Sequence, residues 1–371
     1  MKGTVLITGG AGFIGSHVTN ELLKSGYHVR VLDSLVTQVH GSDPGRPAYL
    51  HKDAEFILGD IRNPEVVDDA LAGVDAVYHF AALVGVGQSM YQTAEYTSVN
   101  NLGTAVLLER IVKQPVSKLI VASSMSVYGE GLYLTESGEP CMHAIRKPQQ
   151  LKAREWEMKT ADGLPLRPVA TPETKQPSLA SVYALSKYDQ EQMCLMMGRA
   201  YGIPTVALRF FNAYGPYQSL SNPYTGVLAI FAARLMNGER PIIFEDGEQL
   251  RDFVSVYDIA RACRLALEVT AAEDMIFNVG SGQKISIKEV ASKLSNVLGE
   301  KMEPKITANY RVGDIRHCFP DIGLARRVLG YEPQTTLEHG MLDLAAWLER
   351  QTALDRFDEM RNELASRGLV V

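Results

Sequence analysis

Short runs of apolar residues alternate with longer segments of helical periodicity through the first half of the chain. The apolar runs are rich in valine, isoleucine and leucine, and they lie at residues 4–8, 28–33, 55–60, 76–82, 118–124 and 205–212. Near-continuous apolar runs, rather than strict alternation with polar residues, are typical of strands that are covered on both faces. With helical segments between them, they predict an α/β fold with a Rossmann-type doubly wound parallel sheet.

The pattern changes after residue 212, where prolines and glycines interrupt "AYGPYQSLSNPYTG" and short mixed elements follow a helical stretch at 227–237. We expect a smaller C-terminal lobe that binds the substrate. The expected division is a sheet domain of residues 1–211, which contains an inserted segment at about 130–175 and also receives 251–282, and a lobe made of 212–250 and 283–345.

The last part of the chain has its own apolar pattern. From Met341 to Leu364, apolar residues recur at three-to-four spacing, which predicts a long amphipathic helix or a pair of helices. We interpret residues 346–371 mainly as a packed helical tail without a role in chemistry.

Composition and charge exclude several classes of function. A chain of 371 residues has room for two lobes, and its net charge of -6 argues against nucleic acid and anionic membranes as partners. No apolar run reaches the roughly 18 residues of a membrane span, and the N-terminus lacks the apolar core of a signal peptide. The four cysteines are scattered without a CxxC pair; they are Cys141, Cys194, Cys263 and Cys318. We therefore expect a cytoplasmic protein with neither disulfides nor a metal site.

The first apolar run leads into a glycine-rich loop, "VLITGGAGFIGSH", which holds Gly9, Gly12 and Gly15. Glycines after a strand and at the start of a helix let the backbone approach a pyrophosphate, which then binds free helix amides. Asp33 closes the second run, where a carboxylate would bind ribose hydroxyls and favour NAD over NADP. The alternative for Asp33 is a capping role. Asp60 closes the third run, where it could bind the adenine or simply form a turn.

A tyrosine and a lysine lie four residues apart in "SVYALSKYDQE", after a predicted helix start at Pro177–Ser178. Tyr183 and Lys187 therefore project from one helical face. A phenol needs help to act as a base near neutral pH, and an ammonium together with a positive nicotinamide would favour its phenolate. Ser124 ends a predicted buried strand and could hold the same substrate oxygen.

The chain resembles the extended short-chain dehydrogenase/reductases that act on nucleotide sugars. The resemblance rests on the order and spacing of "TGGAGFIGSH", Asp33, "GDIR", "HFAA", Asn100 ahead of "GT", "SSMSVYG", the Tyr183/Lys187 pair, "LRFFNAYGP", "RDFVSVYDIARA" and "FNVGSG". It implies that Ser124, Tyr183 and Lys187 are catalytic. It further implies NAD contacts by Gly9, Gly12, Phe13, Ile14, Gly15, Asp33, Asp60, Ile61, Ala81, Asn100, Tyr183 and Lys187, and substrate contacts by Val84, Ser124, Ser126, Asn212, Phe244, Arg251 and Arg316.

Met125 and Ser126 narrow the reaction that the resemblance implies. Relatives that eliminate water carry an Asp-Glu pair at these positions, those that decarboxylate keep the glutamate, and some that epimerise beside a ketone use a cysteine. Neither residue here is a carboxylate or a thiol. We therefore expect oxidation and reduction at one carbon: a 4-epimerase of a nucleoside diphosphate sugar that passes through a 4-keto intermediate and keeps its NAD.

The substrate is left open by the sequence. Mostly neutral groups in "AALVGVGQS" and "YQSLSNPYTGVLAIF", together with the insertion, resemble bacterial epimerases of deoxysugar nucleotides, which implies dTDP-L-rhamnose and dTDP-6-deoxy-L-talose. UDP-glucose/UDP-galactose and UDP-glucuronate are alternatives. We interpret the insertion as a lid over the sugar, although a surface insertion without a role is comparably favoured.

Two rival functions are compatible with the same residues. A net 4-ketosugar reductase would use the same residues, but Asp33 argues against its usual NADPH. A non-catalytic NAD-sensing protein would not need an intact catalytic set.

The helix after Tyr183 carries more apolar residues than one buried face requires, which predicts a homodimer. These residues are Met193, Leu195, Met196 and Met197.

Overall fold

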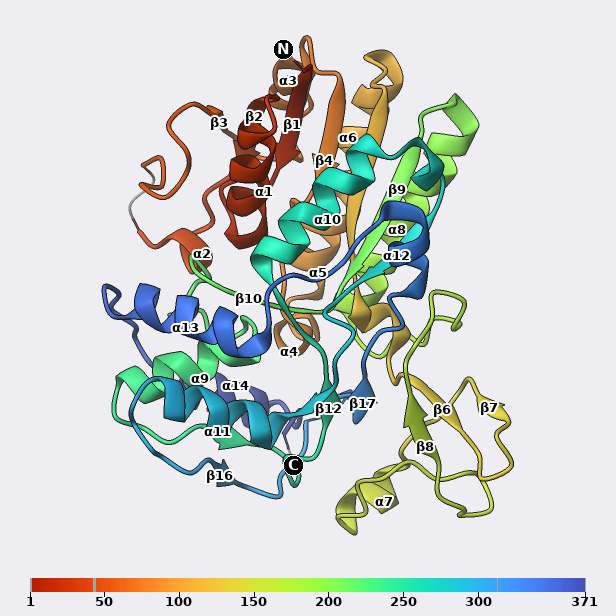
Figure 1. Cartoon of the computed structure of the whole chain (residues 1–371), viewed down its shortest axis with the longest axis vertical. Coiled ribbons are helices and arrows are strands. Elements are labelled where there is room, and N and C mark those ends of the chain that lie inside the picture. Colours follow the sequence, from red (N-terminus) through yellow and green to blue (C-terminus); the bar gives the residue numbers. More distant parts are fainter. Residues whose placement is uncertain (1, 43–44, 312, 371) are drawn as a thin grey trace.

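A computed structural model describes residues 2–42, 45–311 and 313–370. Within these residues, seven parallel strands form one sheet in the order β14-β9-β5-β4-β1-β2-β3 (Figure 1). Their bounds are β1 Thr4–Thr8, β2 His28–Asp33, β3 Glu55–Leu58, β4 Ala76–His79, β5 Lys118–Ser124, β9 Thr205–Phe210 and β14 Ile276–Val279. All six predicted strands are present, and the predicted Rossmann-type class is confirmed.

Helices cover both faces of this sheet because its strands are apolar on both sides. On β1, Val5 and Ile7 belong to one buried cluster while Leu6 belongs to another, since successive side chains of a strand point to opposite faces. The helices on the two faces are α1 Phe13–Lys24, α10 Val256–Glu268 and α12 Gly323–Leu329 on one side, and α3 Pro64–Leu71, α6 Gly103–Lys113 and α8 Val182–Tyr201 on the other.

The smaller lobe lies below the carboxyl ends of the strands (Figure 1). Its helices bury a separate apolar cluster that includes Leu228, Val290 and Leu344. The lobe comprises α9 Val227–Met236, α11 Ile287–Val297, α13 Leu337–Leu348, α14 Phe357–Ser366 and the short strands β10 Asn212–Tyr214, β11 Ile242–Ile243, β12 Leu250–Arg251, β13 Phe253–Ser255, β15 Ile285–Ser286, β16 Lys305–Ile306 and β17 His317–Cys318. The helix pair predicted near the C-terminus is confirmed as α13 and α14.

The inserted segment forms a small unit of its own beside the lobe (Figure 1). Three antiparallel strands, in the order β7-β6-β8, enclose a small apolar cluster around Tyr133 and Met158. The bounds are β6 Leu132–Leu134, β7 Pro140–Cys141 and β8 Arg167–Val169, with the short helix α7 Pro148–Lys152 between β7 and β8.

Short helices connect the main elements, and one boundary differs from its prediction. They are α2 Thr37–His40, α4 Val86–Ser89, α5 Thr93–Tyr96, the π-helix η1 Thr97–Leu102, and the 3-10 helices η2 Met125–Tyr128 and η3 Thr270–Ala272. Helix α8 begins at Val182, not at Pro177–Ser178 as predicted, because the Ser181 hydroxyl accepts the Ala184 amide as its N-cap. Among the described helices, none combines the length and apolar character that a membrane span needs.

Candidate active site

A cavity of about 930 Å³ lies between the carboxyl ends of the sheet strands and the smaller lobe. Gly9 and Ser124 reach it from the sheet side, while Asn212 and Arg251 reach it from the lobe. The carboxyl edge of a doubly wound sheet is where such folds bind their ligands. The order of the strands therefore explains why the predicted cofactor loop and the predicted catalytic residues meet in one place.

The glycine loop forms the cavity wall at the start of α1. A Cβ atom on Gly9 would lie 2.7 Å from the Ala81 nitrogen, and one on Gly15 would lie 2.5 Å from the Gly9 carbonyl oxygen, so neither position accepts a larger residue. Gly12 caps α1 without any side-chain hydrogen bond, and no acidic residue lies in the first turn. The free amides and the positive end of α1 therefore suit a pyrophosphate. Phe13 and Ile14 line the same wall.

Carboxylates follow the second and third strands at the same end of the cavity. Asp33 accepts hydrogen bonds from the Ala11 amide at 3.0 Å and the Leu35 amide at 2.9 Å, which fixes its position beside the glycine loop. Asp60 forms an ion pair with Arg62 at 2.6 Å, and Arg62 holds the pKa of Asp60 below its usual value. Ile61 and Ala81 also line this region. The arrangement fits an adenosine half with unphosphorylated ribose hydroxyls.

Ser124, Tyr183 and Lys187 all line the cavity. Burial raises the pKa of the Tyr183 phenol, and its hydrogen bond with Ser124 opposes that shift. The Ser124 oxygen also accepts hydrogen bonds from the Ser126 amide at 3.1 Å and the Ser126 hydroxyl at 3.0 Å, because Ser124 is the N-cap of η2. The phenol and the serine hydroxyl therefore lie beside each other at the cavity wall.

A buried polar network fixes Lys187. Its ammonium donates to Gln190 at 2.7 Å, and the Gln190 amide contacts His79 at 3.1 Å and donates to Thr104 at 2.9 Å. Burial lowers the pKa of Lys187 to about 8 and that of His79 to about 3. His79 is therefore neutral at physiological pH. Lys187, one helical turn after Tyr183 on α8, is the cation that lies nearest to Tyr183 along this helix.

An ion pair one turn further along α8 anchors the helix to the sheet. Glu191 receives two hydrogen bonds from Arg209 of β9, at 2.9 and 2.7 Å, and a third from Ser123 of β5 at 2.6 Å. Both charged side chains are fully buried. Since removal of one partner of a buried pair leaves an uncompensated charge, this contact holds α8 in register with the loop that carries Ser124.

The predicted substrate residues Val84, Ser126, Asn212, Phe244 and Arg251 also line the cavity. The side-chain oxygen of Asn212 is buried without a hydrogen-bond partner in the described chain, which suits a ligand contact. Arg251 is held by the carbonyl oxygens of Leu250, Ile315 and Arg316.

Two predicted contact residues lie elsewhere. Asn100 is buried and bonds Leu83 and Ser186, so it supports the cavity wall and does not line it. Arg316, predicted to contact the sugar diphosphate, is also absent from the cavity lining, because three carboxylates hold it: Glu157, Glu245 and Asp246. This placement contradicts the predicted role of Arg316.

Arg311, from the same "RVGDIR" motif, does line the cavity and was missed from the sequence. Its guanidinium lies 5.0 Å from the centre of the Phe244 ring and 3.0 Å from the Asp314 carboxylate. The signal available in the sequence was two arginines five residues apart, and only the fold shows that Arg311 faces the cavity while Arg316 faces away.

The C-terminal helix α14 is a second feature that the sequence did not predict for the site. Phe357, Met360 and Leu364 line the cavity, and the Phe357 ring lies 6.2 Å from the Phe244 ring. At the other end of α14, the Leu364 side chain lies against Gly87 of α4. The predicted passive tail is therefore a wall of the site.

The insertion was predicted to form a lid, and the structure does not support this. None of its described residues lines the cavity. Its contacts go to the segments around Glu245 and Arg316 instead. Among the described residues, no cluster of histidine, cysteine, aspartate or glutamate suits a metal ion, and the four cysteines are free thiols.

Fold and site together define an enzyme that binds a dinucleotide and carries the serine, tyrosine and lysine of a short-chain dehydrogenase/reductase. The model of the NAD dependent epimerase/dehydratase family matches residues 5–148 and 161–280, and the chain belongs to this family. NAD is accordingly the cofactor, and the residues that would hold it are the glycine loop, Asp33 and the Tyr183/Lys187 pair.

Similar proteins and structures cover nearly the whole chain. A dTDP-L-rhamnose 4-epimerase of Burkholderia thailandensis is 35% identical over 95% of this chain and 96% of its own length. The structure of the Thermotoga maritima UDP-glucose 4-epimerase with UDP-glucose is 31% identical, with a TM-score of 0.76, over 94% of this chain and 99% of that chain. The structure of the Thermus thermophilus UDP-glucose 4-epimerase in complex with NAD is 30% identical, also with a TM-score of 0.76, over 94% of this chain and 100% of that chain.

Proposed function

We propose that the protein is an NAD-dependent 4-epimerase of a nucleoside diphosphate sugar. One observation carries the proposal: Ser124, Tyr183 and Lys187 meet at the cavity, whereas the loop that follows Ser124 supplies Met125 and Ser126 instead of a carboxylate or a thiol. Redox chemistry at one carbon needs only a base for the hydroxyl proton and a hydride acceptor. Elimination or epimerisation beside the ketone would need a further acid or base.

In the proposed mechanism, the Tyr183 phenolate accepts the proton of the C4 hydroxyl, and Ser124 holds the same oxygen by hydrogen bonding. Lys187 stabilises the phenolate through its positive charge. NAD supplies reversible hydride transfer at C4. After the 4-keto sugar has turned its other face towards the position of the nicotinamide, Tyr183 would return the proton to the C4 oxygen, so that only the configuration at C4 changes.

The diphosphate and the base would bind at the lobe end of the cavity. Arg251 and Arg311 are the cations that line this end, and arginine gives a planar grip on phosphate oxygens. Phe244 lies beside Arg311 and offers a flat apolar surface to a base. Arg316 has no part in this proposal.

We infer that the sugar is neutral and propose dTDP-L-rhamnose and dTDP-6-deoxy-L-talose as the substrate pair. Val84, Val86 and Met90 line the cavity at and beside helix α4, whose Ser89 hydroxyl accepts the Tyr183 amide at 3.0 Å. Of the arginines and lysines that line the cavity, Arg62 is paired with Asp60 and the others are assigned to catalytic or diphosphate positions. A 6-carboxylate would therefore lack a counter-charge, which disfavours UDP-glucuronate. The name of the Burkholderia thailandensis relative, a dTDP-L-rhamnose 4-epimerase, supports the deoxysugar over UDP-glucose.

The test is an assay of purified protein with a panel of dTDP and UDP sugars, in which inversion at C4 is followed by NMR. We expect dTDP-L-rhamnose to be converted with the highest kcat/KM. Faster conversion of UDP-glucose would move the assignment to that alternative, and no inversion of any member of the panel would contradict the proposed activity.

We also propose that the protein is a homodimer, although three of the four apolar α8 residues pack inside the subunit. Leu195 is buried, and Met193 and Met197 pack against the same core cluster, while Met196 is 53% exposed. The exposed apolar side chains Leu102 and Leu185 support an interface at this face. Sedimentation at micromolar concentration would test it, with a monomer as the contrary result.

A further inference from the structure

Two separate segments of the lobe form the end of the cavity where the nucleoside diphosphate is proposed to bind. One segment carries Phe244, and the other carries Arg311 and Asp314. They meet where the Glu245 amide donates to the Asn309 carbonyl oxygen at 2.7 Å, and where Arg311 lies over the Phe244 ring. The relative position of these two segments therefore sets the geometry of the proposed grip on the substrate.

The turn after Phe244 depends on tertiary contacts to hold its shape. Glu245 has a φ of 56°, in the left-handed region that non-glycine residues seldom adopt. Such a conformation persists only where the surroundings fix it. The Glu245 side chain is 1% exposed, and its carboxylate lies between two guanidiniums, 2.6 Å from Arg146 and 3.1 Å from Arg316.

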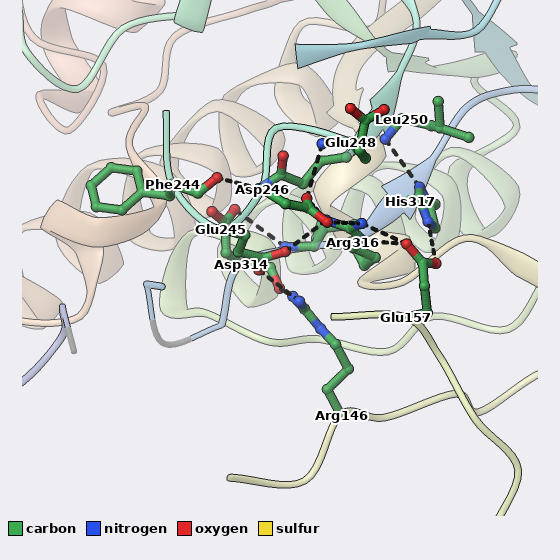
Figure 2. Close-up of polar contacts among 12 residues, drawn as sticks. Arg146, Glu157, Phe244, Glu245, Asp246, Glu248, Leu250, Asp314, Arg316 and His317 are labelled. Atoms are coloured by element: carbon green, nitrogen blue, oxygen red, sulfur yellow. Dashed lines mark hydrogen bonds and ion pairs between the residues drawn. The ribbon is translucent and has the colours of Figure 1, made fainter. Parts of the chain in front are cut away.

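Arg146 belongs to the insertion and contacts both cavity segments at once. One of its terminal nitrogens binds the Glu245 carboxylate, and the other donates to the Asp314 carbonyl oxygen at 2.9 Å (Figure 2). The Arg146 side chain is 5% exposed, so these contacts are shielded from water. A single guanidinium from outside the cavity thus ties together the two segments that line its end.

A second residue of the insertion, Glu157, reinforces the same place. Its carboxylate accepts hydrogen bonds from the Arg316 Nε atom at 3.1 Å and from a terminal Arg316 nitrogen at 2.5 Å, and it lies 3.0 Å from the His317 ring (Figure 2). Those two residues follow Arg311 and Asp314 along the chain, and His317 is the first residue of β17. Glu157 therefore fixes the far end of the segment whose near end Arg146 holds.

The charges favour the same interpretation. Arg146 provides half of the positive charge around the buried Glu245 carboxylate, and Arg316 provides the rest. Without Arg146, the buried Glu245 carboxylate would keep one cationic partner, Arg316, which Glu157 and Asp246 share. Since removal of one partner of a buried pair leaves an uncompensated charge, the turn at Glu245 would lose its fixed position, and with it the contact to the segment that carries Arg311.

We propose that the insertion positions the nucleoside diphosphate end of the active site, with Arg146 as the main positioning residue and Glu157 as its support. The proposal rests on the proposed function, because it assumes that Phe244 and Arg311 contact a nucleoside diphosphate sugar. It gives the insertion a role in substrate affinity instead of a role as a lid, and it leaves the redox chemistry and the NAD site to other residues.

The test compares Arg146→Met with Arg167→Met, a control at an exposed arginine on β8 of the same insertion. For Arg146→Met we expect KM for the nucleotide sugar, and Kd for dTDP and UDP measured by calorimetry, to rise about tenfold to a hundredfold, as small misplacements of contact groups do. The kcat value and the bound NAD should stay at the wild-type level. Arg167→Met should match the wild type throughout.

Arg146→Lys keeps the positive charge but cannot bind Glu245 and Asp314 with two separate nitrogens. We therefore expect its KM to lie between those of the wild type and Arg146→Met. If Arg146→Met does not fold, this variant decides the question alone. Unchanged KM and Kd values in the Arg146 variants would overturn the proposal, as would an equal loss of kcat and bound NAD. A wild-type protein that neither binds dTDP or UDP nor inverts any sugar would instead overturn the proposed function.

Discussion

At the scale of single residues, the proposed reaction depends on the hydroxyl of Tyr183. Replacement of Tyr183 by Phe removes the proton acceptor but leaves the ring and the cavity wall in place, so we expect kcat to fall by at least about a hundredfold. Bound NAD, measured after denaturation of the purified protein, should be retained. Tyr188→Phe, on the same helix but away from the cavity lining, serves as the matched control and should stay active.

The charge of Lys187 gives a prediction for pH. Because burial lowers its pKa to about 8, Lys187 loses its proton as the pH rises through that value, and the phenolate then loses its stabilising cation. We expect kcat to fall above pH 8 in a pH-rate profile on enzyme that stays folded. A constant kcat up to pH 10 would contradict this role of Lys187.

Single residues could be predicted where a motif fixes both their type and their direction. The Tyr183/Lys187 spacing places both side chains on one helical face, and the glycine loop admits no larger residue at Gly9 or Gly15. The arginines of "RVGDIR" could not be assigned in this way. Arg316 is held by Glu157 of the insertion and by Glu245 and Asp246 of the lobe, and sequence spacing does not encode such contacts.

At the scale of elements, α14 joins the two ends of the cavity. Phe357 is 4% exposed and packs against Phe244, so Phe357→Ala should lower the free energy of unfolding by about 3–5 kcal/mol and raise KM for the nucleotide sugar. Leu354→Ala, at a residue that is 61% exposed just before the same helix, should change stability by less than about 0.5 kcal/mol. Urea unfolding measures both variants, and equal stabilities would contradict the packing role of Phe357.

Glu157 predicts how the attachment of the insertion depends on pH. Its hydrogen bond with His317 and the charge of Arg316 lower its pKa to about 2. A carboxyl whose pKa is depressed by folding stabilises the folded state above its unfolded pKa of about 4.3, and this contribution is lost as the pH falls towards 2. The stability deficit of Glu157→Gln, from urea midpoints, should therefore be largest near neutral pH and shrink below pH 4. A deficit that does not change with pH would contradict the ion-pair role.

The strands were predictable because their apolar runs are long, continuous and separated by helical segments. The start of α8 was not, since Ser181 lies close to Pro177–Ser178 and either site has the residue types of a helix start. The role of the insertion was also beyond prediction, because a polar, turn-rich segment does not show which surface it packs against.

At the scale of the whole molecule, the site exists because remote parts of the chain meet around one cavity. Gly9, Ser124 and Tyr183 reach it from the sheet domain, and Arg311 and Phe357 reach it from the last quarter of the chain. The doubly wound sheet could be predicted from apolar periodicity alone. The closure of the cavity could not be predicted from this periodicity, since it depends on contacts between segments more than a hundred residues apart.

The most direct test of the proposed mechanism follows the hydrogen at C4. Purified protein would be incubated with a nucleotide sugar deuterated at C4, dTDP-L-rhamnose first, in ordinary water without added NAD, and the product examined by NMR. We expect the C4-inverted product to keep its deuterium, because the hydride returns from the same cofactor molecule to the same carbon. Loss of deuterium from C4, or exchange with solvent at C3 or C5, would contradict the proposed mechanism.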